Sequence, residues 1–404
     1  MSAPVAAGAP GQAPTAGGRG PAARLRVLHV GKFYPPYRGG METHLEQLCR
    51  ALAARDDAHV DVRVVVSAAG RRGGREVAAG GIDVTRLGTF ATVAGASLSP
   101  GMRAAIRTWA ADVVHLHLPN PSAVLAYLAS GRRGPLVATY HSDVVRQKLL
   151  GRAFEPLLRR FLGRCDAVLV SSPDYLASSP VLRDFRDRCR VIPFGIPPRP
   201  ATAEDEGEAA AIRARHGPRL VLGVGRLVGY KGFGVLVRAM AAVDGTLLLV
   251  GDGPLRARLE GEARRHRVAG RVVFVGQVPS VMPYFRAADV FALPSVSRAE
   301  AFGLVQLEAM ACGTPVVNTA LASGVPFVSR HGETGLTVPP GDAPALAAAL
   351  TRLLGDTELR ARYGAAALRR VAEEFSVDVM AERTLALYGD VMRAHGRAAE
   401  AVAS

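Results

Sequence analysis

The sequence predicts two doubly wound α/β domains in series, and three observations support this fold class. The 404 residues are enough for two domains of about 100–200 residues each. Short runs rich in β-branched residues alternate with segments of helical length, as in parallel sheets that are covered on both faces. This alternation is interrupted once, by a segment rich in proline and then in acidic residues. Because ligands bind such sheets at the carboxyl ends of the strands, we expect a site in the cleft between two facing domains.

Residues 1–23 precede the alternation and are rich in Ala, Gly and Pro. They lack a basic start followed by a continuous apolar block, so we expect a disordered tail and no signal peptide. The first domain is predicted over 24–198, with helices over 41–55 and 144–162. Its predicted strands contain LRVLHV, VDVRVVVSA, DVVHLHL, PLVATYH, AVLVSS and RVIPFG.

A linker is predicted over 199–210, where prolines and then acidic residues break the pattern. The second domain is predicted over 211–375, with helices over 344–354 and 359–374. Its predicted strands contain RLVLGVGR, TLLLVGDG, RVVFVGQV, DVFALPS, TPVVNT and GLTVPP. Residues 376–404 are expected to form a helix that packs back on the first domain, followed by a tail.

The composition limits the possible function classes. A net charge of +15 and a pI of about 10.4 favour polyanionic partners such as nucleic acid, an anionic membrane or nucleotide phosphates. Nucleic acid is poorly supported, because only 6% of the residues are aromatic and no recognised nucleic-acid motif occurs. The four cysteines are scattered and no apolar run reaches about 18 residues. We therefore expect a cytoplasmic protein with reduced thiols, no disulfide, no zinc site and no membrane span.

A glycine-rich turn, GRLVGYKGFG at 225–234, follows the apolar run RLVLGV and precedes a helical pattern. Gly225 lets the backbone approach a ligand, and Arg226 and Lys231 add positive charge near a helix N-terminus, where an anion is favoured. A dinucleotide fingerprint fits poorly because Val228 stands at its sixth position, and a Walker loop fails because no G-K-[ST] occurs. The turn alone is equally consistent with an ordinary tight turn carrying two surface cations.

A second motif, SRAEAFGLVQLEAMACGTPVV at 297–317, places Glu300 and Glu308 eight residues apart. A helix is predicted from about Phe302 to Gly313, with a proline blocking its continuation. Glu300 then lies at the helix mouth, beside the free N–H groups of Phe302, Gly303 and Leu304, and Glu308 lies two turns further on. Two carboxylates so placed can bind hydroxyl groups at two points of an extended ligand. The alternative is a pair of surface glutamates on an amphipathic helix.

These two motifs in this order resemble the retaining glycosyltransferases of family 4, and the similarity extends from Arg24 to about Arg393. Other segments that fit the family are FYPPYRGGMETHLEQL, VIPFGI, GDGP and HGETGLTVPPGD. The resemblance implies the GT-B architecture, in which two Rossmann-like domains bind a nucleotide-sugar in the cleft between them. The sequence departs from the family pattern at two places. ALASGVP has only Gly324 where many family members have a glycine pair, and Phe194 stands where asparagine is frequent.

The resemblance implies a role for each matching residue. Arg226 and Lys231 are expected to bind the donor diphosphate and stabilise the leaving nucleotide, Glu308 to bind the ribose hydroxyls, and Glu300 to contact the transferred sugar.

Other matches concern the backbone near the donor. Gly39 and Gly40 match a loop that approaches the diphosphate from the first domain, and His141 matches a histidine near the donor sugar. Backbone groups of Gly276, Gln277 and Val278 are expected to contact the base.

The resemblance implies a retaining enzyme that moves a hexose from a GDP- or UDP-linked donor to a glycan or lipid-linked acceptor in cell-envelope polysaccharide or glycolipid synthesis. No D-x-D triplet occurs, so we expect metal-independent catalysis with no cofactor besides the donor. His141 could act as an acid or base or could bind a sugar hydroxyl. A GT-B sugar phosphorylase or sugar-phosphate synthase is the enzymatic alternative, although no lysine of the sequence is matched to the cofactor lysine that a phosphorylase needs.

The segment 144–165 carries six basic residues against one acid, Glu155, beside apolar residues at three- and four-residue spacing. One interpretation is a domain helix whose apolar stripe faces its own sheet. The other is docking of a peripheral enzyme on anionic lipid at the inner face of the cell membrane. The basic residues are Arg146, Lys148, Arg152, Arg159, Arg160 and Arg164.

Overall fold

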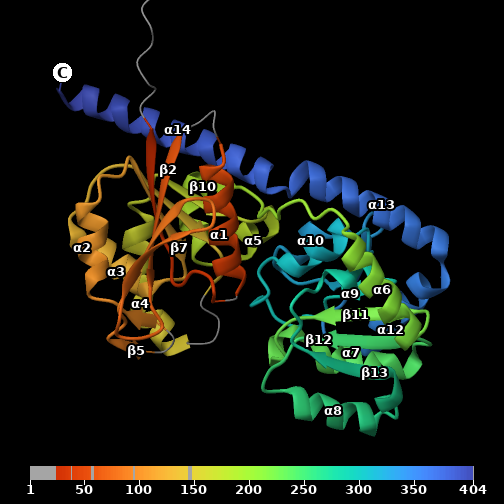
Figure 1. The fold of residues 1–404 in the computed structure, drawn as a ribbon. Coiled ribbons are helices and arrows are strands. Elements are labelled where there is room, and N and C mark those ends of the chain that lie inside the picture. The colour runs from red at the N-terminus through yellow and green to blue at the C-terminus, as the bar shows by residue number, and fades with distance from the viewer. Residues whose placement is uncertain (1–23, 38, 56–58, 94–95, 144–147, 404) are drawn as a thin grey trace, which may run out of the picture.

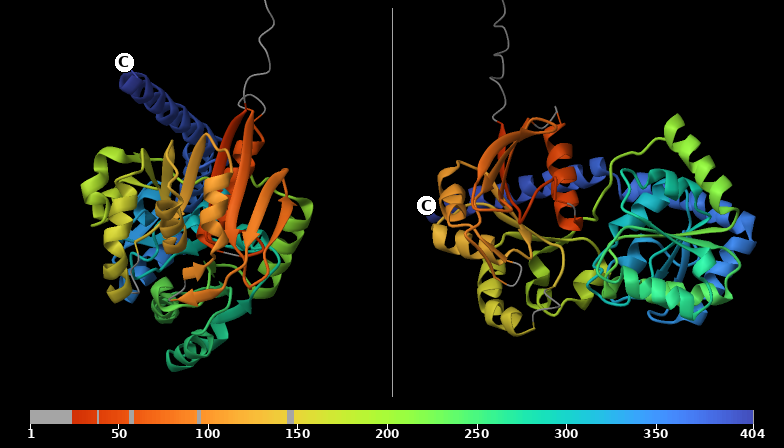
Figure 2. Two further views of the ribbon diagram at one scale, coloured as in Figure 1. Left: turned by 90° about the vertical axis from the view of Figure 1, so that its left-hand side faces the viewer. Right: turned by 60° about the horizontal axis from the view of Figure 1, so that its bottom comes forward.

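The computed structural model contains two α/β domains side by side, spanned by the last helix (Figures 1 and 2). It describes residues 24–37, 39–55, 59–93, 96–143 and 148–403, without the side chains of 93, 96, 148–152 and 397–403. No helix within these ranges is long and apolar enough to cross a membrane. The predicted fold class, two doubly wound parallel sheets, is confirmed.

The first domain is built on an eight-stranded sheet with the order β10-β9-β8-β7-β1-β2-β4-β3. Neighbouring strands are parallel except at the edge, where β3 runs antiparallel to β4. Its strands are β1 (Leu25–Val30), β2 (Val60–Ser67), β3 (Gly74–Ala78), β4 (Ile82–Leu87), β7 (Val113–Leu118), β8 (Leu136–Tyr140), β9 (Ala167–Val170) and β10 (Cys189–Val191), and a separate hairpin pairs β5 (Ala91–Val93) with β6 (Ala96–Leu98). The helices are α1 (Gly40–Ala53), α2 (Gly101–Thr108), α3 (Pro121–Ser130), α4 (Lys148–Leu162), α5 (Pro173–Ser178) and the 3₁₀ segment η1 (Leu182–Arg188).

The second domain is built on a six-stranded, fully parallel sheet with the order β13-β12-β11-β14-β15-β16. Its strands are β11 (Leu220–Val224), β12 (Thr246–Val250), β13 (Val272–Gly276), β14 (Val290–Ala292), β15 (Val316–Thr319) and β16 (Gly335–Val338). Its helices are α6 (Ala203–His216), α7 (Phe233–Ala239), α8 (Arg256–Arg265), α9 (Met282–Ala287), α10 (Leu304–Ala311), α11 (Val325–Val328), α12 (Ala343–Gly355) and α13 (Thr357–Glu374). Short 3₁₀ turns are η2 (Gly229–Lys231), η3 (Met240–Ala242) and η4 (Ala269–Arg271).

Each sheet is buried on both faces because the crossover helices alternate sides. In the first domain, α2, α3 and α4 cover one face, and α1 covers the other together with α14 (Val377–Ala403). In the second domain, α7, α8 and α12 cover one face and α6, α9, α10 and α13 the other. The loops at the carboxyl ends of the strands are left to form sites.

The segment predicted as a linker, 199–210, is helical from Ala203 onward. Thr202 caps α6 by accepting a hydrogen bond from the backbone N–H of Asp205, and three acids in the first turn favour the helix N-terminus. The acidic residues that interrupt the strand pattern are therefore a helix start, and the connection proper is the proline-rich part before it.

The last helix, α14, leaves the second domain and lies across the first (Figure 1). Met380, Tyr388 and Val391 are buried in the first domain's core, and the Tyr388 hydroxyl lies 2.6 Å from Nδ1 of His115 on β7. The chain thus passes between the domains twice, and the two passages are joined by hydrogen bonds through the backbone of Ile196.

The structure favours the core interpretation of the segment 144–165 wherever its side chains are described. Leu158, Phe161 and Leu162 are buried in the core under β8 and β9, and Arg159 pairs with Glu155 and Asp184. Phe154 and Leu157 are half-buried, so most but not all of the described stripe is withdrawn from a lipid surface. Arg146, Lys148 and Arg152 lie outside the described side chains.

Candidate active site

The strand order of each sheet locates its binding edge. In the second domain, numbering the strands in chain order gives 3-2-1-4-5-6, so the order reverses between β11 and β14. In the first domain it reverses between β1 and β7. Loops that leave these four strands at their carboxyl ends are where a ligand is expected, and they carry most of the predicted residues.

Lys231 and Glu300 come from the loops after β11 and β14 and form a buried ion pair. Nζ of Lys231 lies 2.6 Å from Oε2 of Glu300, and Ser295 Oγ donates to the same oxygen at 3.0 Å. The loops meet because Gly232 has a positive φ of 71° and no side chain, and a Cβ there would lie 1.9 Å from the carbonyl oxygen of Pro294.

The environment keeps Lys231 positively charged. Burial, the largest influence, lowers its pKa, but attraction to Glu300 and to Tyr230 and the hydrogen bond to Glu300 outweigh it, so the pKa is raised. A fixed cation is therefore present at the switch point, where a diphosphate would bind.

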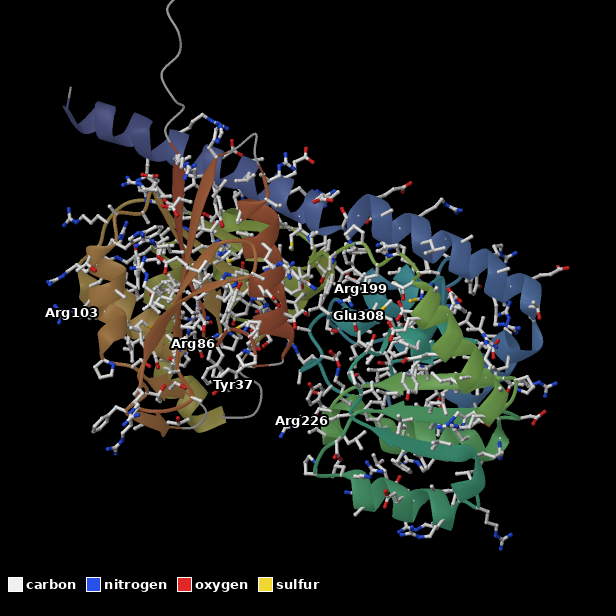
Figure 3. All side chains as sticks on the ribbon, viewed as in Figure 1. Tyr37, Arg86, Arg103, Arg199, Arg226 and Glu308 are labelled. Carbon is white, nitrogen blue, oxygen red and sulfur yellow. The ribbon has the colours of Figure 1, made fainter. Side chains whose placement is uncertain are left out.

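Arg226 lies in the same loop, exposed at the side of the second domain that faces the first (Figure 3). Three glycine turns meet behind it. The backbone N–H of Gly251 donates to the carbonyl oxygen of Gly276 at 2.7 Å, and a Cβ on Gly251 would lie 2.2 Å from the carbonyl oxygen of Gly225. The predicted base-contacting residues Gln277 and Val278 follow this cluster directly, Gln277 exposed and Val278 half-buried.

Helix α10 follows the loop that carries Glu300 and bears the predicted ribose-binding residue. It begins at Leu304, after Phe302 and Gly303, and Gly303 has a positive φ of 73°. The carboxylate of Glu308, one turn into the helix, lies 3.9 Å from the guanidinium of Arg199 (Figure 3). Burial raises the pKa of Glu308, and Arg199 opposes this shift.

The glycine pair of the first domain faces α10. A Cβ on Gly40 would lie 3.9 Å from Cδ1 of Leu304, so the N-terminus of α1, with Gly39 as its cap, lies next to that of α10. Arg86 on β4 steadies the preceding loop by donating hydrogen bonds to the carbonyl oxygens of Tyr34 and Pro35.

His141, directly after β8, lies in a buried group of histidines that the sequence analysis did not identify. The others are His29, His44, His115 and His117. The ring of Phe194 packs against His141 with a centroid distance of 5.0 Å and against Phe302 of the second domain at 5.1 Å. Phe194, which stands where the family often has asparagine, therefore makes an aromatic contact between the domains. The alternation in DVVHLHL placed His115 and His117 on one face of a strand, which was the available signal.

An ion pair between the domains was also missed. Arg298, two residues before Glu300, donates to Oδ2 of Asp143, two residues after His141, at 2.7 Å. Oδ1 of Asp143 accepts hydrogen bonds from Tyr140 and Ser179, both at 2.9 Å. The pair ties the two loops that carry predicted catalytic residues, and nothing in either motif indicates that they are partners.

Comparisons with known proteins agree with this geometry. Residues 38–199 match the profile of Glycosyltransferase Family 4, and residues 205–370 match that of Glycosyl transferases group 1. The chain is 34% identical over 343 residues to the D-rhamnosyltransferase WbpZ of Pseudomonas aeruginosa, covering 81% of this chain and 86% of that protein. It is 31% identical to the O-antigen chain mannosyltransferase C of Escherichia coli, covering 90% and 98%.

The chain belongs to glycosyltransferase family 4. It is a retaining hexosyltransferase whose donor is a nucleotide-sugar. Among solved structures, the sucrose-phosphate synthase of Thermosynechococcus elongatus matches with a TM-score of 0.77 and 27% identity, covering 92% of this chain and all of that one. Anabaena HepE in complex with UDP matches in fold with a TM-score of 0.73 at 21% identity, covering 91% and 100%.

The first prediction concerns the two cations of the β11 loop. Replacing Arg226 or Lys231 with Ala is expected to lower transfer by about 10²-fold or more, because each is predicted to donate to charge that develops on the leaving diphosphate. Steady-state kinetics measures this, and Arg238→Ala, which removes an arginine of the adjacent helix α7, is the matched control. Turnover like that of the wild type in the Arg226 and Lys231 variants would remove the loop from the mechanism.

The second prediction concerns the protonation of Glu308. The pKa of Glu308 is raised, so as the pH falls the carboxyl takes up its proton at a pH above 4.5, the ordinary pKa of a glutamate. A carboxylate accepts hydrogen bonds from ribose hydroxyls better than the neutral acid does. The affinity for nucleoside diphosphate should therefore fall as the pH drops and Glu308 becomes protonated. Calorimetric titration should show a smaller loss of affinity with falling pH in Glu308→Gln. In that variant only protonation of the ligand itself contributes to the loss. Equal pH slopes in both proteins would contradict the assignment.

The third prediction concerns the ion pair between the domains. Arg298→Gln is expected to lower turnover by about 10-fold or more, since hydrogen bonds between charged groups are worth about 1.5–3 kcal/mol. Free nucleotide should bind normally, because Glu308 is not touched. Arg330→Gln, which breaks an exposed pair within the second domain, is the control. Hydrogen exchange should rise in 297–303 of the Arg298 variant alone, and unchanged exchange there would rule out the tie.

Proposed function

We propose that this enzyme transfers a hexose of manno configuration from a GDP- or UDP-linked donor to a glycan or lipid-linked acceptor in cell-envelope polysaccharide synthesis. The sugars in the names of two relatives support the configuration, because D-rhamnose is 6-deoxy-D-mannose. Several relatives act in O-antigen, lipopolysaccharide or glycolipid assembly, which supports the acceptor class.

The observation that carries the proposal is the buried Lys231–Glu300 pair, which lies at the switch point of the second sheet. In the proposed reaction, Lys231 and Arg226 bind the diphosphate and oppose the negative charge that grows as the bond to the anomeric carbon breaks. Glu300 keeps Lys231 in place and accepts hydroxyls of the transferred sugar. Glu308 binds the ribose, and the N-termini of α1 and α10 offer backbone N–H groups to the phosphates.

Retention follows from attack on the face that the leaving diphosphate vacates. The acceptor hydroxyl approaches the anomeric carbon on that face and passes its proton to a departing phosphate oxygen. No side chain is then needed as a covalent nucleophile, and no proton acceptor beyond the leaving group. The proposal includes catalysis without a metal ion.

The fourth prediction tests the donor class. GDP or UDP should raise the melting temperature, and transfer should follow with GDP-mannose or GDP-D-rhamnose but more slowly with UDP-glucose. Activity should persist in excess chelator, and its loss with restoration by magnesium would contradict the metal-free mechanism.

Acceptors separate the remaining alternatives. A membrane extract or a lipid-linked oligosaccharide should accept the sugar, whereas fructose 6-phosphate should not. Transfer to the sugar phosphate would instead support a sugar-phosphate synthase, the activity of a structural relative. Phosphorolysis of a glycan would support a phosphorylase, and binding of RNA or DNA without nucleotide stabilisation would overturn the enzymatic proposal.

A further inference from the structure

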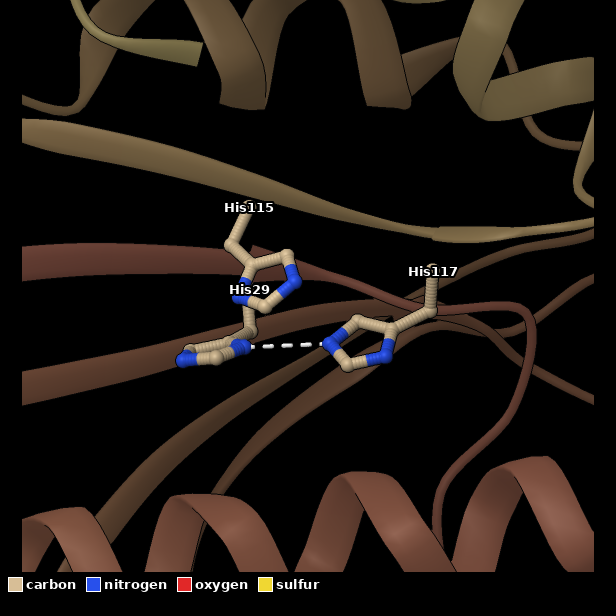
Figure 4. Close-up of side chains that lie close together, drawn as sticks. All are labelled: His29, His115 and His117. Atoms are coloured by element: carbon tan, nitrogen blue, oxygen red, sulfur yellow. Dashed lines mark hydrogen bonds between the residues drawn. The ribbon is translucent and has the colours of Figure 1, made fainter. Parts of the chain in front are cut away.

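Three buried histidines form a hydrogen-bonded chain that ends at His141. Nδ1 of His29, on β1, lies 3.1 Å from Nε2 of His117, on β7, and Figure 4 shows this contact. Nδ1 of His117 lies 3.2 Å from Nε2 of His141. His29 and His117 are fully buried, and His141 is 7% exposed. The chain therefore runs from the interior of the sheet to the loop after β8.

All three rings are uncharged at neutral pH. Burial lowers the pKa of His29 and of His141 to about 3. Burial, with the neighbouring rings, lowers the pKa of His117 well below its ordinary value. A neutral imidazole has one N–H group and one lone pair, so each ring can donate once and accept once.

Two hydrogen bonds among three neutral rings allow two proton arrangements. In one, every ring is protonated at Nδ1: His29 donates to His117, and His117 donates to His141. In the other, every ring is protonated at Nε2, and both bonds run in the reverse direction. The tautomer of His141 is thus fixed by the tautomers of His117 and His29.

His29, at the inner end of the three hydrogen-bonded histidines, distinguishes the two proton arrangements. Nε2 of His29 is buried and has no hydrogen-bond partner among the described residues. Protonation at this atom would leave a buried N–H group unpaired, which folded proteins rarely contain. The arrangement protonated at Nδ1 avoids this orphan donor.

We propose that His29 and His117 are positioning residues that hold His141 as the tautomer protonated at Nδ1. Because Nε2 of His141 is bound to His117, Nδ1 is the nitrogen that can meet a ligand, and it meets it as a donor. The inference rests on the proposed function, in which His141 contacts the transferred sugar. His141 then donates a hydrogen bond to a sugar oxygen and does not act as an acid or base.

A metal ion is the competing interpretation of the same cluster. Ring nitrogens of His29, His115 and His117, and of His44, His117 and His141, lie within 4.8 Å of one another. His117 belongs to both groups, and its two nitrogens already face other histidine nitrogens at hydrogen-bond distance. His115 is bound to Tyr388 and Thr139 instead. Protons therefore account for the distances from His29 to His117 and from His117 to His141, whereas neither ring nitrogen of His44 has a hydrogen-bond partner among the described residues.

Nitrogen NMR of ¹⁵N-histidine-labelled protein without donor tests the chain itself. At pH 6–8 the signals of His141, assigned by their loss in His141→Gln, should show a protonated Nδ1 and a bare Nε2. His117→Leu should convert them to a mixture of tautomers. His115→Leu, on the same strand and face, is the matched control and should leave them unchanged. Protonation at Nε2 in the wild type, or an equal effect of both variants, would overturn the proposal, as would stoichiometric zinc bound by these rings.

Kinetics tests the consequence for transfer. His117→Leu should lower kcat by about 10-fold with little change in the donor KM, because the donor to the sugar is misplaced while the nucleotide contacts remain. His117→Asn, whose amide nitrogen can replace Nδ1 as a donor to His141, should restore most of the rate. The wild-type pH profile should show no histidine ionisation between pH 5 and 8, and an ionisation there abolished by His141→Gln would overturn the proposal. If no nucleotide-sugar is turned over, the proposed function fails while the NMR result remains readable.

Discussion

The contact between the loops after β11 and β14 is the constraint on which the candidate site depends. Gly232 lets the two loops touch, and the Lys231–Glu300 pair closes the contact with both side chains almost out of solvent. A cation so held does not need to be desolvated or ordered when an anionic ligand arrives, and this preorganisation is the main contribution of such sites to catalysis. The other predicted residues are arranged around this point.

The sequence predicted the parts of the site that lie within one motif. Loop glycines and helix limits, which depend on a few neighbouring residues, marked Lys231, Glu300 and Glu308 as candidates, and the family resemblance gave them their expected roles. Their roles as ligands of a donor stay predictions. The alternation of strands and helices likewise predicted both sheets, which the structure confirms.

Features that depend on pairing across the chain could not be predicted. The Arg298–Asp143 pair joins residues 155 positions apart, and the histidine cluster requires the order of β1, β7 and β8 within the sheet. The acids of 199–210 could not be told from a linker because a capped helix start and a charged loop have similar compositions. The sequence could not show whether the apolar stripe of α4 is buried, because this depends on how the helix packs on the sheet.

The return of α14 to the first domain has a consequence for synthesis on the ribosome. Tyr388 completes the bonding of His115 across 273 residues, so the first sheet lacks part of its cover until nearly all of the second domain has been made. At about 5–20 residues per second, the roughly 200 residues after β10 take about 10–40 s to translate. During that interval a face of the nascent sheet, with its histidines, is open to water and to chaperones. The first domain is therefore the last to acquire its complete core, although it is the first to be translated.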